Sequence, residues 1–246
     1  MVQIKTIKII LLVGTLLLFI PVFAPVQIAV ATVTTASVSQ AQDLGWWGRV
    51  TVNGLNVRSG PSPQSPKVGA LSAINRVKVL ATKNGWDKID GGRYPGDWIS
   101  SAYVARIAQP APDRNISVPA GVGPGQFWID VNIAKETLTL FQYQKPVFAT
   151  YVSTGLAASP TMRGTFQIWE KLLKARMHGG PPFATHVYDL ANVPWTMYYH
   201  GSFAVHGTYW HDNFGRPQSA GCTNITQGDA KYIYSKVGVG TVVYNH

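Results

Sequence analysis

The chain of 246 residues contains a single cysteine, Cys222, and few charged side chains. With only one thiol, an internal disulfide framework is excluded. Charged residues make up 13% of the sequence, whereas Trp, Tyr and Phe together make up 11%. This composition favours β-rich structure over a helical bundle, and it differs from the composition of disordered chains.

Negative charge is especially scarce, with 11 acidic residues against 21 Lys and Arg. Removing residues 1–31 takes away two basic residues and no acidic one, which leaves a net charge of +8. Such a charge attracts anionic wall polymers or lipid head groups. The basic residues are scattered, with no cluster and no basic helix, so nucleic acid is not an expected partner. We interpret the charge as a means of retention in a cell wall.

The one long apolar run stands at the N-terminus, from Ile9 to Phe23, after two lysines; no further charge occurs before Asp43. This pattern predicts a signal peptide over residues 1–31, with cleavage after Ala31 or after Ala41. The alternative is an uncleaved anchor, because the run is near the lower length limit for a membrane span. In both cases the remainder is exported to the cell wall or periplasm, and after cleavage no stable membrane span is expected.

Composition divides the remaining chain into four parts. Residues 32–45, rich in Thr, Ser and Ala, predict a tether. Residues 46–107 contain short alternating runs between Gly, Pro and Asn turns, which predict a small β-barrel. Residues 108–125 carry four prolines and predict an extended linker. Residues 126–246 predict a mainly β sandwich.

Within this last part, two alternating runs flank Ala134 to Glu136 and predict a hairpin. One late helix is also expected, because Thr226 and Asp229 match the capping-box pattern at a helix start. Apolar residues follow at helical spacing: Ala230, Ile233, Tyr234 and Val237.

The chemistry concentrates around Cys222. A thiol is a good nucleophile only as a thiolate, so it requires a nearby base, and His206 ends an apolar strand sixteen residues earlier. Gly221 leaves the backbone open, so its amide and that of Cys222 are candidates for an oxyanion site. Asp212 is the one nearby carboxylate that could orient the histidine. The alternative is a buried, unreactive thiol.

This segment, Ala-Val-His-Gly followed by Ser-x-Gly-Cys-x-Asn, closely resembles the signature of the L,D-transpeptidase (YkuD-type) catalytic domain. The strands LTLFQYQKPVFATYVSTG and PTMRGTFQI are similar to the N-terminal half of that domain, so the resemblance covers residues 126–246. In residues 46–107, LNVRSGPS and DWISSAYV resemble the bacterial SH3-like domain. Such domains are thought to bind wall peptides or glycans; a plain spacer is the alternative.

The resemblance implies that Cys222 is the acylated nucleophile and that His206 is its base. It further implies that the backbone carbonyl of Gly207, and no carboxylate, orients the histidine. The other signature positions are expected to shape the loop and the oxyanion site: Ser219, Gly221 and Asn224.

One position departs from the family pattern, because Ala220 stands where many members have histidine. His211 is a candidate to occupy part of that space. The stretch Val193 to Tyr199 and Trp210 are expected to line the substrate groove, although core positions are the alternative. The candidate substrate-binding residues are therefore Trp195, Tyr199, Trp210 and His211.

The resemblance implies that Cys222 attacks the carbonyl of the third residue of a peptidoglycan tetrapeptide stem and expels D-alanine. Transfer to the side-chain amine of a neighbouring stem gives a 3–3 cross-link, whereas water as acceptor makes the enzyme an L,D-carboxypeptidase. No metal or cofactor is expected. Stem peptides and wall glycan are the expected partners, and carbapenems are expected to acylate Cys222.

The sequence also bears on three alternatives. Five of the six histidines fall between His178 and His211, but none has the spacing of zinc ligands. A papain-like peptidase is disfavoured because its cysteine precedes its histidine in the chain. The third alternative, which remains open, is a non-catalytic wall-binding protein with a degenerate transpeptidase domain, in which Ala220 would be a sign of lost activity.

Overall fold

The computed structural model describes residues 45–113, 116–181 and 187–246. The expected signal peptide, residues 1–31, and residues 32–44 of the expected tether lie outside the described residues. Of the helices within the described ranges, none has the length and apolar character needed to cross a membrane.

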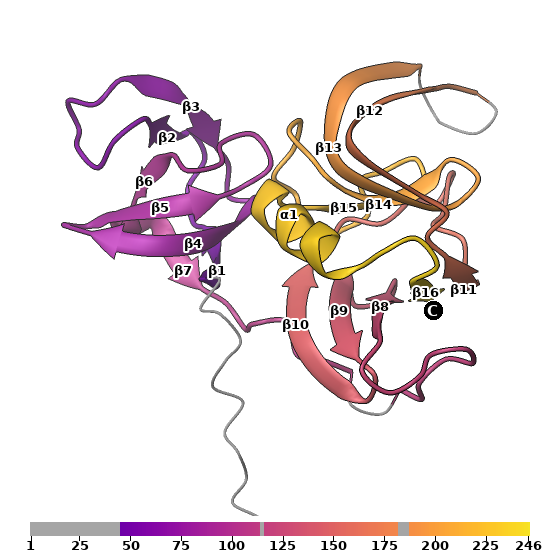
Figure 1. Cartoon of the computed structure of the whole chain (residues 1–246). Helices are drawn as coiled ribbons and strands as arrows, with labels where there is room; N and C mark the ends of the chain where they lie inside the picture. Colours follow the sequence, from indigo (N-terminus) through magenta and orange to yellow (C-terminus); the bar gives the residue numbers. More distant parts are fainter. Residues whose placement is uncertain (1–44, 114–115, 182–186) are drawn as a thin grey trace, which may run out of the picture. The chain divides into compact units, whose positions relative to one another are not determined.

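The first unit consists of seven strands and a short 3-10 helix. Their bounds are β1 (Trp46–Val50), β2 (Leu55–Arg58), β3 (Lys67–Leu71), β4 (Arg76–Lys83), β5 (Trp86–Asp90), β6 (Trp98–Ser100), η1 (Ser101–Tyr103) and β7 (Val104–Arg106). The strands form one sheet in the order β3-β2-β6-β5-β4-β1-β7 (Figure 1). Asn84 and Gly85, both with positive φ (50° and 79°), form the tight turn between β4 and β5. The sheet is open, whereas the sequence predicted a closed barrel.

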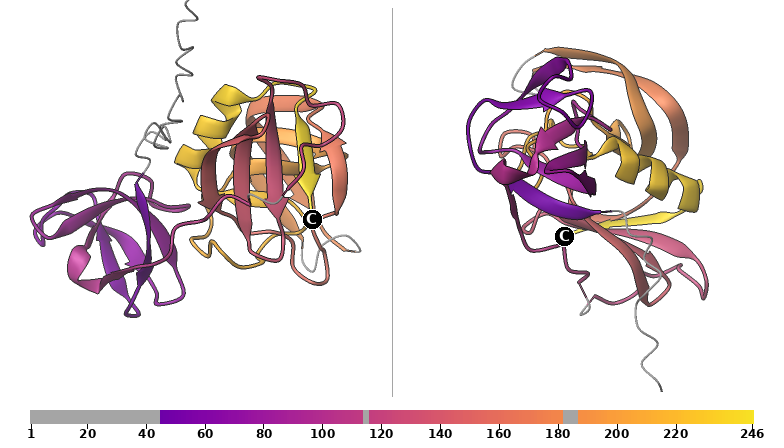
Figure 2. Two further views of the ribbon diagram at one scale, coloured as in Figure 1. Left: turned by 90° about the horizontal axis from the view of Figure 1, so that it is seen from below. Right: turned by 90° about the vertical axis from the view of Figure 1, so that its left-hand side faces the viewer.

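The second unit contains two further sheets and one helix. Its elements are β8 (Phe127–Asn132), β9 (Thr137–Gln142), β10 (Lys145–Tyr151), β11 (Gly164–Gln167), β12 (Glu170–Gly179), β13 (Tyr188–His200), β14 (Phe203–Gly207), β15 (Thr223–Ile225), α1 (Gln227–Lys236) and β16 (Val242–Asn245). One sheet has the order β10-β9-β8-β16-β11 and the other the order β12-β13-β14-β15. In Figure 2, α1 is the coiled yellow ribbon of this unit. The predicted mainly β fold with one late helix is confirmed over the part of the chain that the structure describes.

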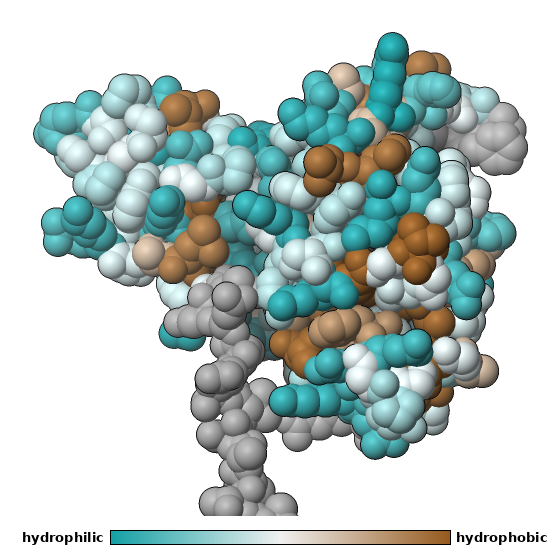
Figure 3. Space-filling view, viewed as in Figure 1, coloured by the Kyte–Doolittle hydropathy of each residue, from teal (hydrophilic) through white to brown (hydrophobic). Residues whose placement is uncertain are grey.

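The core of the second unit lies between its two sheets and α1. Ile129 and Leu140 come from the five-stranded sheet, Met197 and Val205 from the four-stranded sheet, and Ile233 from α1; all five are fully buried in one cluster. Burial of these side chains is the main stabilising contribution to this arrangement. On the outside, Figure 3 shows separate hydrophobic patches within a mostly hydrophilic surface.

The predicted hairpin and helix start are both present. β8 and β9 pair around a turn that ends at Glu136, which has a positive φ of 52°. The helix α1 begins after Thr226, whose side-chain oxygen accepts a hydrogen bond from the Asp229 amide at 3.2 Å. Only half of a capping box forms, because the Asp229 carboxylate accepts hydrogen bonds from Lys78 and Thr150.

Candidate active site

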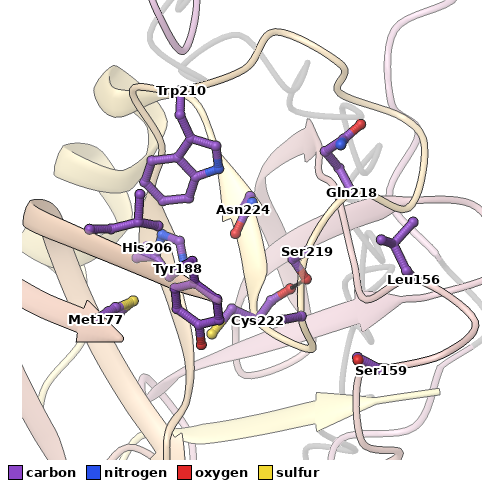
Figure 4. Close-up of a pocket in the computed structure, with 12 residues that line it drawn as sticks. Leu156, Ser159, Met177, Tyr188, His206, Trp210, Gln218, Ser219, Cys222 and Asn224 are labelled. Carbon is purple, nitrogen blue, oxygen red and sulfur yellow. Dashed lines mark hydrogen bonds between the residues drawn. The ribbon is translucent and has the colours of Figure 1, made fainter. Parts of the chain in front are cut away.

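Parallel pairing of β14 with β15 brings His206 and Cys222 to one pocket. His206 lies in β14, and Cys222 directly precedes β15, where Thr223 pairs with Val205. Both side chains line the same pocket, together with Trp210 (Figure 4). The nucleophile and base predicted from the sequence are therefore placed around a common space.

His206 is held by its own strand. The ring is 2% exposed, and its Nδ1 lies 3.0 Å from the backbone carbonyl oxygen of Gly207. Because a carbonyl only accepts hydrogen bonds, Nδ1 carries the proton and Nε2 keeps its lone pair. Burial lowers the pKa of His206 to about 4, although the hydrogen bond to Gly207 opposes this shift. The ring is therefore neutral near pH 7 and able to accept a proton.

Cys222 is half-buried, with its sulfur 3.6 Å from the backbone carbonyl oxygen of Ser202. Burial raises the pKa of the Cys222 thiol to about 11, and a backbone hydrogen bond with Ala204 opposes the shift. With this thiol and a neutral His206, the resting site holds a neutral pair.

Ser219 and Gly221 fix the turn before the nucleophile. The Ser219 hydroxyl donates to the carbonyl oxygen of Cys222 at 2.6 Å and accepts from the Gly221 amide at 3.1 Å. Gly221 has φ +116°, and a Cβ at this position would lie 2.4 Å from the ring of Phe203. The Gly221 amide is thus engaged within the turn, and the oxyanion role expected for it from the sequence stays a prediction. Its requirement for glycine is conformational.

A second segment supports this turn from behind. The Thr154 carbonyl oxygen accepts hydrogen bonds from the amides of Gln218 (2.8 Å) and Ser219 (3.0 Å). The Thr154 amide in turn donates to the buried carboxylate of Glu136 at 2.7 Å. Strand β15 is joined to the same segment, since the amide and carbonyl groups of Ser153 and Asn224 bond to each other. The Ser-Thr-Gly sequence at 153–155 therefore positions the loop that carries the nucleophile.

Asp212, the carboxylate considered as an orienting group for His206, has other partners. Its side chain is fully buried and accepts hydrogen bonds from the Gly92 amide at 2.6 Å and from Nε of Arg93 at 2.6 Å. Asp212 therefore ties the catalytic loop to the first unit. The role of orienting His206 falls to the Gly207 carbonyl.

The expected substrate-binding residues divide into two groups. Trp210 lines the pocket, and its ring centroid lies 5.7 Å from that of His206. Trp195 instead packs edge-on against Tyr234 of α1, at 5.5 Å between centroids. Tyr199 is 3% exposed and belongs to the core between the sheets. Trp195 and Tyr199 therefore do not line the pocket.

His211 is also absent from the pocket lining. It is buried, its Nδ1 accepts from the Asn213 amide at 3.2 Å, and its Nε2 lies 3.0 Å from the side-chain amide of Asn224. Burial lowers the pKa of His211 to about 3, so the ring is neutral. His211 thus orients Asn224, which does line the pocket, and does not fill the space beside Ala220.

Sequence reasoning missed the wall contributed by the β12–β13 hairpin. Leu190, Met177 and Tyr188 from these strands line the pocket. In Figure 4, Met177 and Tyr188 lie on one side of it, and Leu156 and Ser159 lie on the other. Ala175 and Met177 alternate with exposed residues along β12, which marks a half-buried strand, but alternation does not reveal what the buried face covers.

The histidines that the structure describes do not form a metal site. Among the residues that the structure describes, no group of three or more His, Cys, Asp or Glu is placed to hold a metal ion. His178 and His200 lie in β12 and β13, and His186 is outside the described ranges.

Comparison with protein families gives two matches. Residues 126–244 match the L,D-transpeptidase catalytic domain, YkuD, and residues 53–105 match the bacterial SH3 domain. A search among curated proteins found no match.

The solved structures that match this chain include several L,D-transpeptidases. A Cys-to-Ser mutant from Enterococcus faecium is 21% identical, with a TM-score of 0.45, and the match covers 50% of this chain and 50% of that one. An enzyme from Mycobacterium smegmatis is 18% identical, with a TM-score of 0.46 and coverage of 80% and 94%. An LD transpeptidase in complex with imipenem is 16% identical, with a TM-score of 0.46 and coverage of 80% and 95%. This chain thus spans about half the length of the Enterococcus structure.

Proposed function

Because the chain carries a YkuD-type L,D-transpeptidase catalytic domain preceded by a bacterial SH3 domain, we propose that it is an exported cell-wall enzyme that forms 3–3 peptidoglycan cross-links through Cys222. The observation that carries the proposal is the hydrogen bond from Nδ1 of His206 to the Gly207 carbonyl at 3.0 Å, beside Cys222 in one pocket. This bond leaves Nε2 free to act as the base. A non-catalytic binding module has no requirement for that arrangement.

In the first half-reaction, the Cys222 sulfur attacks the carbonyl carbon of the third stem residue while its proton passes to Nε2 of His206. Carbon–sulfur bond formation and proton transfer occur together, because the resting pair is neutral. The bond to the terminal D-alanine then breaks, and His206 returns the proton to the departing amine. The product is a thioester on Cys222.

In the second half-reaction, the side-chain amine of a neighbouring stem attacks the thioester. His206 accepts a proton from this amine, the carbon–sulfur bond breaks, and the Cys222 thiolate regains the proton. Since the Gly221 amide is bonded to Ser219, we assign stabilisation of the oxyanion to the amide of Cys222. No metal or cofactor takes part in either step.

The pocket walls suit an uncharged segment of the substrate. Its lining consists of apolar and neutral polar side chains, among them Leu156, Met177 and Trp210, and it contains no Lys, Arg, Asp or Glu from the described residues. Apolar walls beside a scissile amide strengthen hydrogen bonds to the oxyanion.

Mass spectrometry of the protein without its expected leader, incubated with a disaccharide-tetrapeptide, tests the proposal. We expect dimers that have lost D-alanine, and no product with a Cys222→Ala control. Loss of D-alanine without dimers would instead assign an L,D-carboxypeptidase. No reaction with folded protein would favour a wall-binding module, and Ala220→His would then be the first variant to make.

Carbapenems provide an independent readout of the nucleophile. We propose that a carbapenem acylates Cys222, and that Cys222→Ala abolishes the adduct in intact-protein mass spectra. An adduct of unchanged yield in the alanine variant would exclude Cys222 as the acylated residue.

A further inference from the structure

A continuous row of residues crosses the four-stranded sheet from Cys222 to its far edge. The pairing of Val205 with Thr223 places Cys222 beside Ala204; Ala204 pairs with Tyr198, and Tyr198 pairs with Glu170. Each step is one strand spacing of about 4.8 Å, so the row spans roughly 14 Å. Cys222 and Tyr198 also belong to the same apolar cluster, which places them on one face of the sheet.

The far end of this row carries an exposed aromatic stack. Trp169 lies parallel to Tyr198, with ring centroids 5.5 Å apart and 26° between the planes. Its amide donates to the Tyr198 carbonyl oxygen at 2.9 Å, which fixes the backbone beneath the ring. Trp169 is 52% exposed, and within the described ranges it is the only tryptophan among the exposed large hydrophobic residues.

Two polar groups lie at the stack, the carboxylate of Glu170 and the hydroxyl of Tyr198. Glu170 pairs with Tyr198 and forms no ion pair within the described residues. Burial raises the pKa of the Tyr198 hydroxyl, and proximity to Cys222 and Glu170 raises it further. The phenol therefore stays a hydrogen-bond donor. An exposed flat ring beside a carboxylate and a phenol matches a pyranose, which has apolar C–H groups on its faces and hydroxyls at its rim.

The length of the row matches the distance, in a peptidoglycan stem, between the attacked carbonyl and the sugar that carries the stem. Three extended residues link the carbonyl attacked by Cys222 to the sugar, and they span roughly 10 Å. The ether link between peptide and sugar adds a few more ångströms, on the order of the remaining distance to the stack. A donor stem that is bound at Cys222 and directed toward β12 is thus long enough to place its own sugar over Trp169, and it passes above Ala204, which is fully buried.

We propose that Trp169, Tyr198 and Glu170 form a saccharide subsite, which binds the glycan residue to which the donor stem is attached. The inference rests on the proposed function, and it makes the enzyme selective for stems that are still joined to glycan. Free stem peptides would react without this contribution to binding.

Steady-state kinetics with two substrates tests the subsite: a free tetrapeptide and the same peptide carrying its disaccharide. We expect the wild type to have an up to about tenfold lower KM for the disaccharide form, the upper end of what an aromatic stacking contact contributes to affinity. Trp169→Ala should remove this difference, with kcat and KM for the free peptide unchanged. Trp169→Phe, which keeps a ring, should retain most of the preference.

Leu173→Ala is the matched control, because Leu173 is 61% exposed on the same strand but is not part of the stack. Equal KM values for both substrates in the wild type, or an equal loss for both in Trp169→Ala, would overturn the subsite. Absence of any turnover would instead count against the proposed function. In that case calorimetric binding of both peptides to Cys222→Ala, with and without Trp169→Ala, decides the subsite: equal affinities would exclude it.

Discussion

Arg93 Nε donates a 2.6 Å hydrogen bond to the carboxylate of Asp212, a residue 119 positions later in the chain. The same carboxylate accepts from the backbone amides of Gly92 and Arg93. The Asp212 side chain is fully buried while that of Arg93 is 35% exposed. Three donors from the first unit thereby hold the loop that lies between His206 and Cys222, and Asp212 has a structural role.

This arrangement predicts that Asp212→Asn lowers thermal stability without changing the chemistry of His206. Loss of the charge in a buried, fully bonded site costs about 3 kcal/mol of unfolding free energy, and Arg93→Ala costs less because its side chain is partly solvated. Thermal melts measure the first effect. The pH profile of Cys222 alkylation should be unchanged in folded protein; a shifted profile would mean that Asp212 does act on His206.

The local parts of the site were predictable from the sequence. His206 and Cys222 lie within one short segment, so their spacing indicated a strand followed by a loop that folds back, whereas the role of Ser219 in that loop was implied by the resemblance to the L,D-transpeptidase domain. The N-cap at Thr226 was predictable for the same reason, because the contact is made within one helical turn.

What the sequence could not supply are contacts between distant segments. Asp229 bonds to Lys78, 151 positions away, instead of completing its capping box. Tyr188 and Met177 enter the pocket because β12 and β13 extend over it, and no local pattern encodes that placement. Tertiary packing also decides that Tyr199 is core and Trp210 is pocket, although both are aromatic residues of the same region.

The pH dependence of thiol reactivity follows from the pKa values of the pair. Because the pKa of Cys222 is raised to about 11 and that of His206 is lowered to about 4, both groups are neutral between pH 5 and 9. The alkylation rate with iodoacetamide should therefore rise about tenfold per pH unit across this range, because the thiolate fraction does so. Mass spectrometry of the alkylated protein measures the rate. A plateau below pH 7 would instead reveal a preformed thiolate–imidazolium pair.

Gly221→Ala should inactivate the enzyme through its backbone. The substitution places a Cβ at a φ of +116° and 2.4 Å from the Phe203 ring, so the turn must move. We expect a loss of stability of about 1–3 kcal/mol and a loss of carbapenem acylation of at least about a hundredfold. Gly238→Ala is the control, since a Cβ there meets no atom within 4 Å. Normal acylation of the Gly221 variant would show that the turn geometry is not required.

Thr161→Val should uncouple the nucleophile turn from the Ser-Thr-Gly segment. The Thr161 hydroxyl accepts a hydrogen bond from the Gly155 amide at 2.9 Å and donates one to the Gly221 carbonyl oxygen at 2.8 Å. Thr161 itself is only 4% exposed. Valine has nearly the same shape but leaves both backbone groups buried and unpaired, at a cost of about 1–3 kcal/mol in unfolding free energy.

We expect Thr161→Val to lower the melting temperature and to slow acylation of Cys222 about tenfold, because a freed Gly221 carbonyl lets the nucleophile leave its position. The control is Thr165→Val, an exposed position in β11 whose hydroxyl makes no such link. If the Thr161 variant is destabilised but acylates at the normal rate, the hydroxyl supports only the fold. If both quantities are unchanged, the link between the two segments does not hold the turn, and the hydrogen bonds from Gln218 and Ser219 to Thr154 are sufficient to hold it.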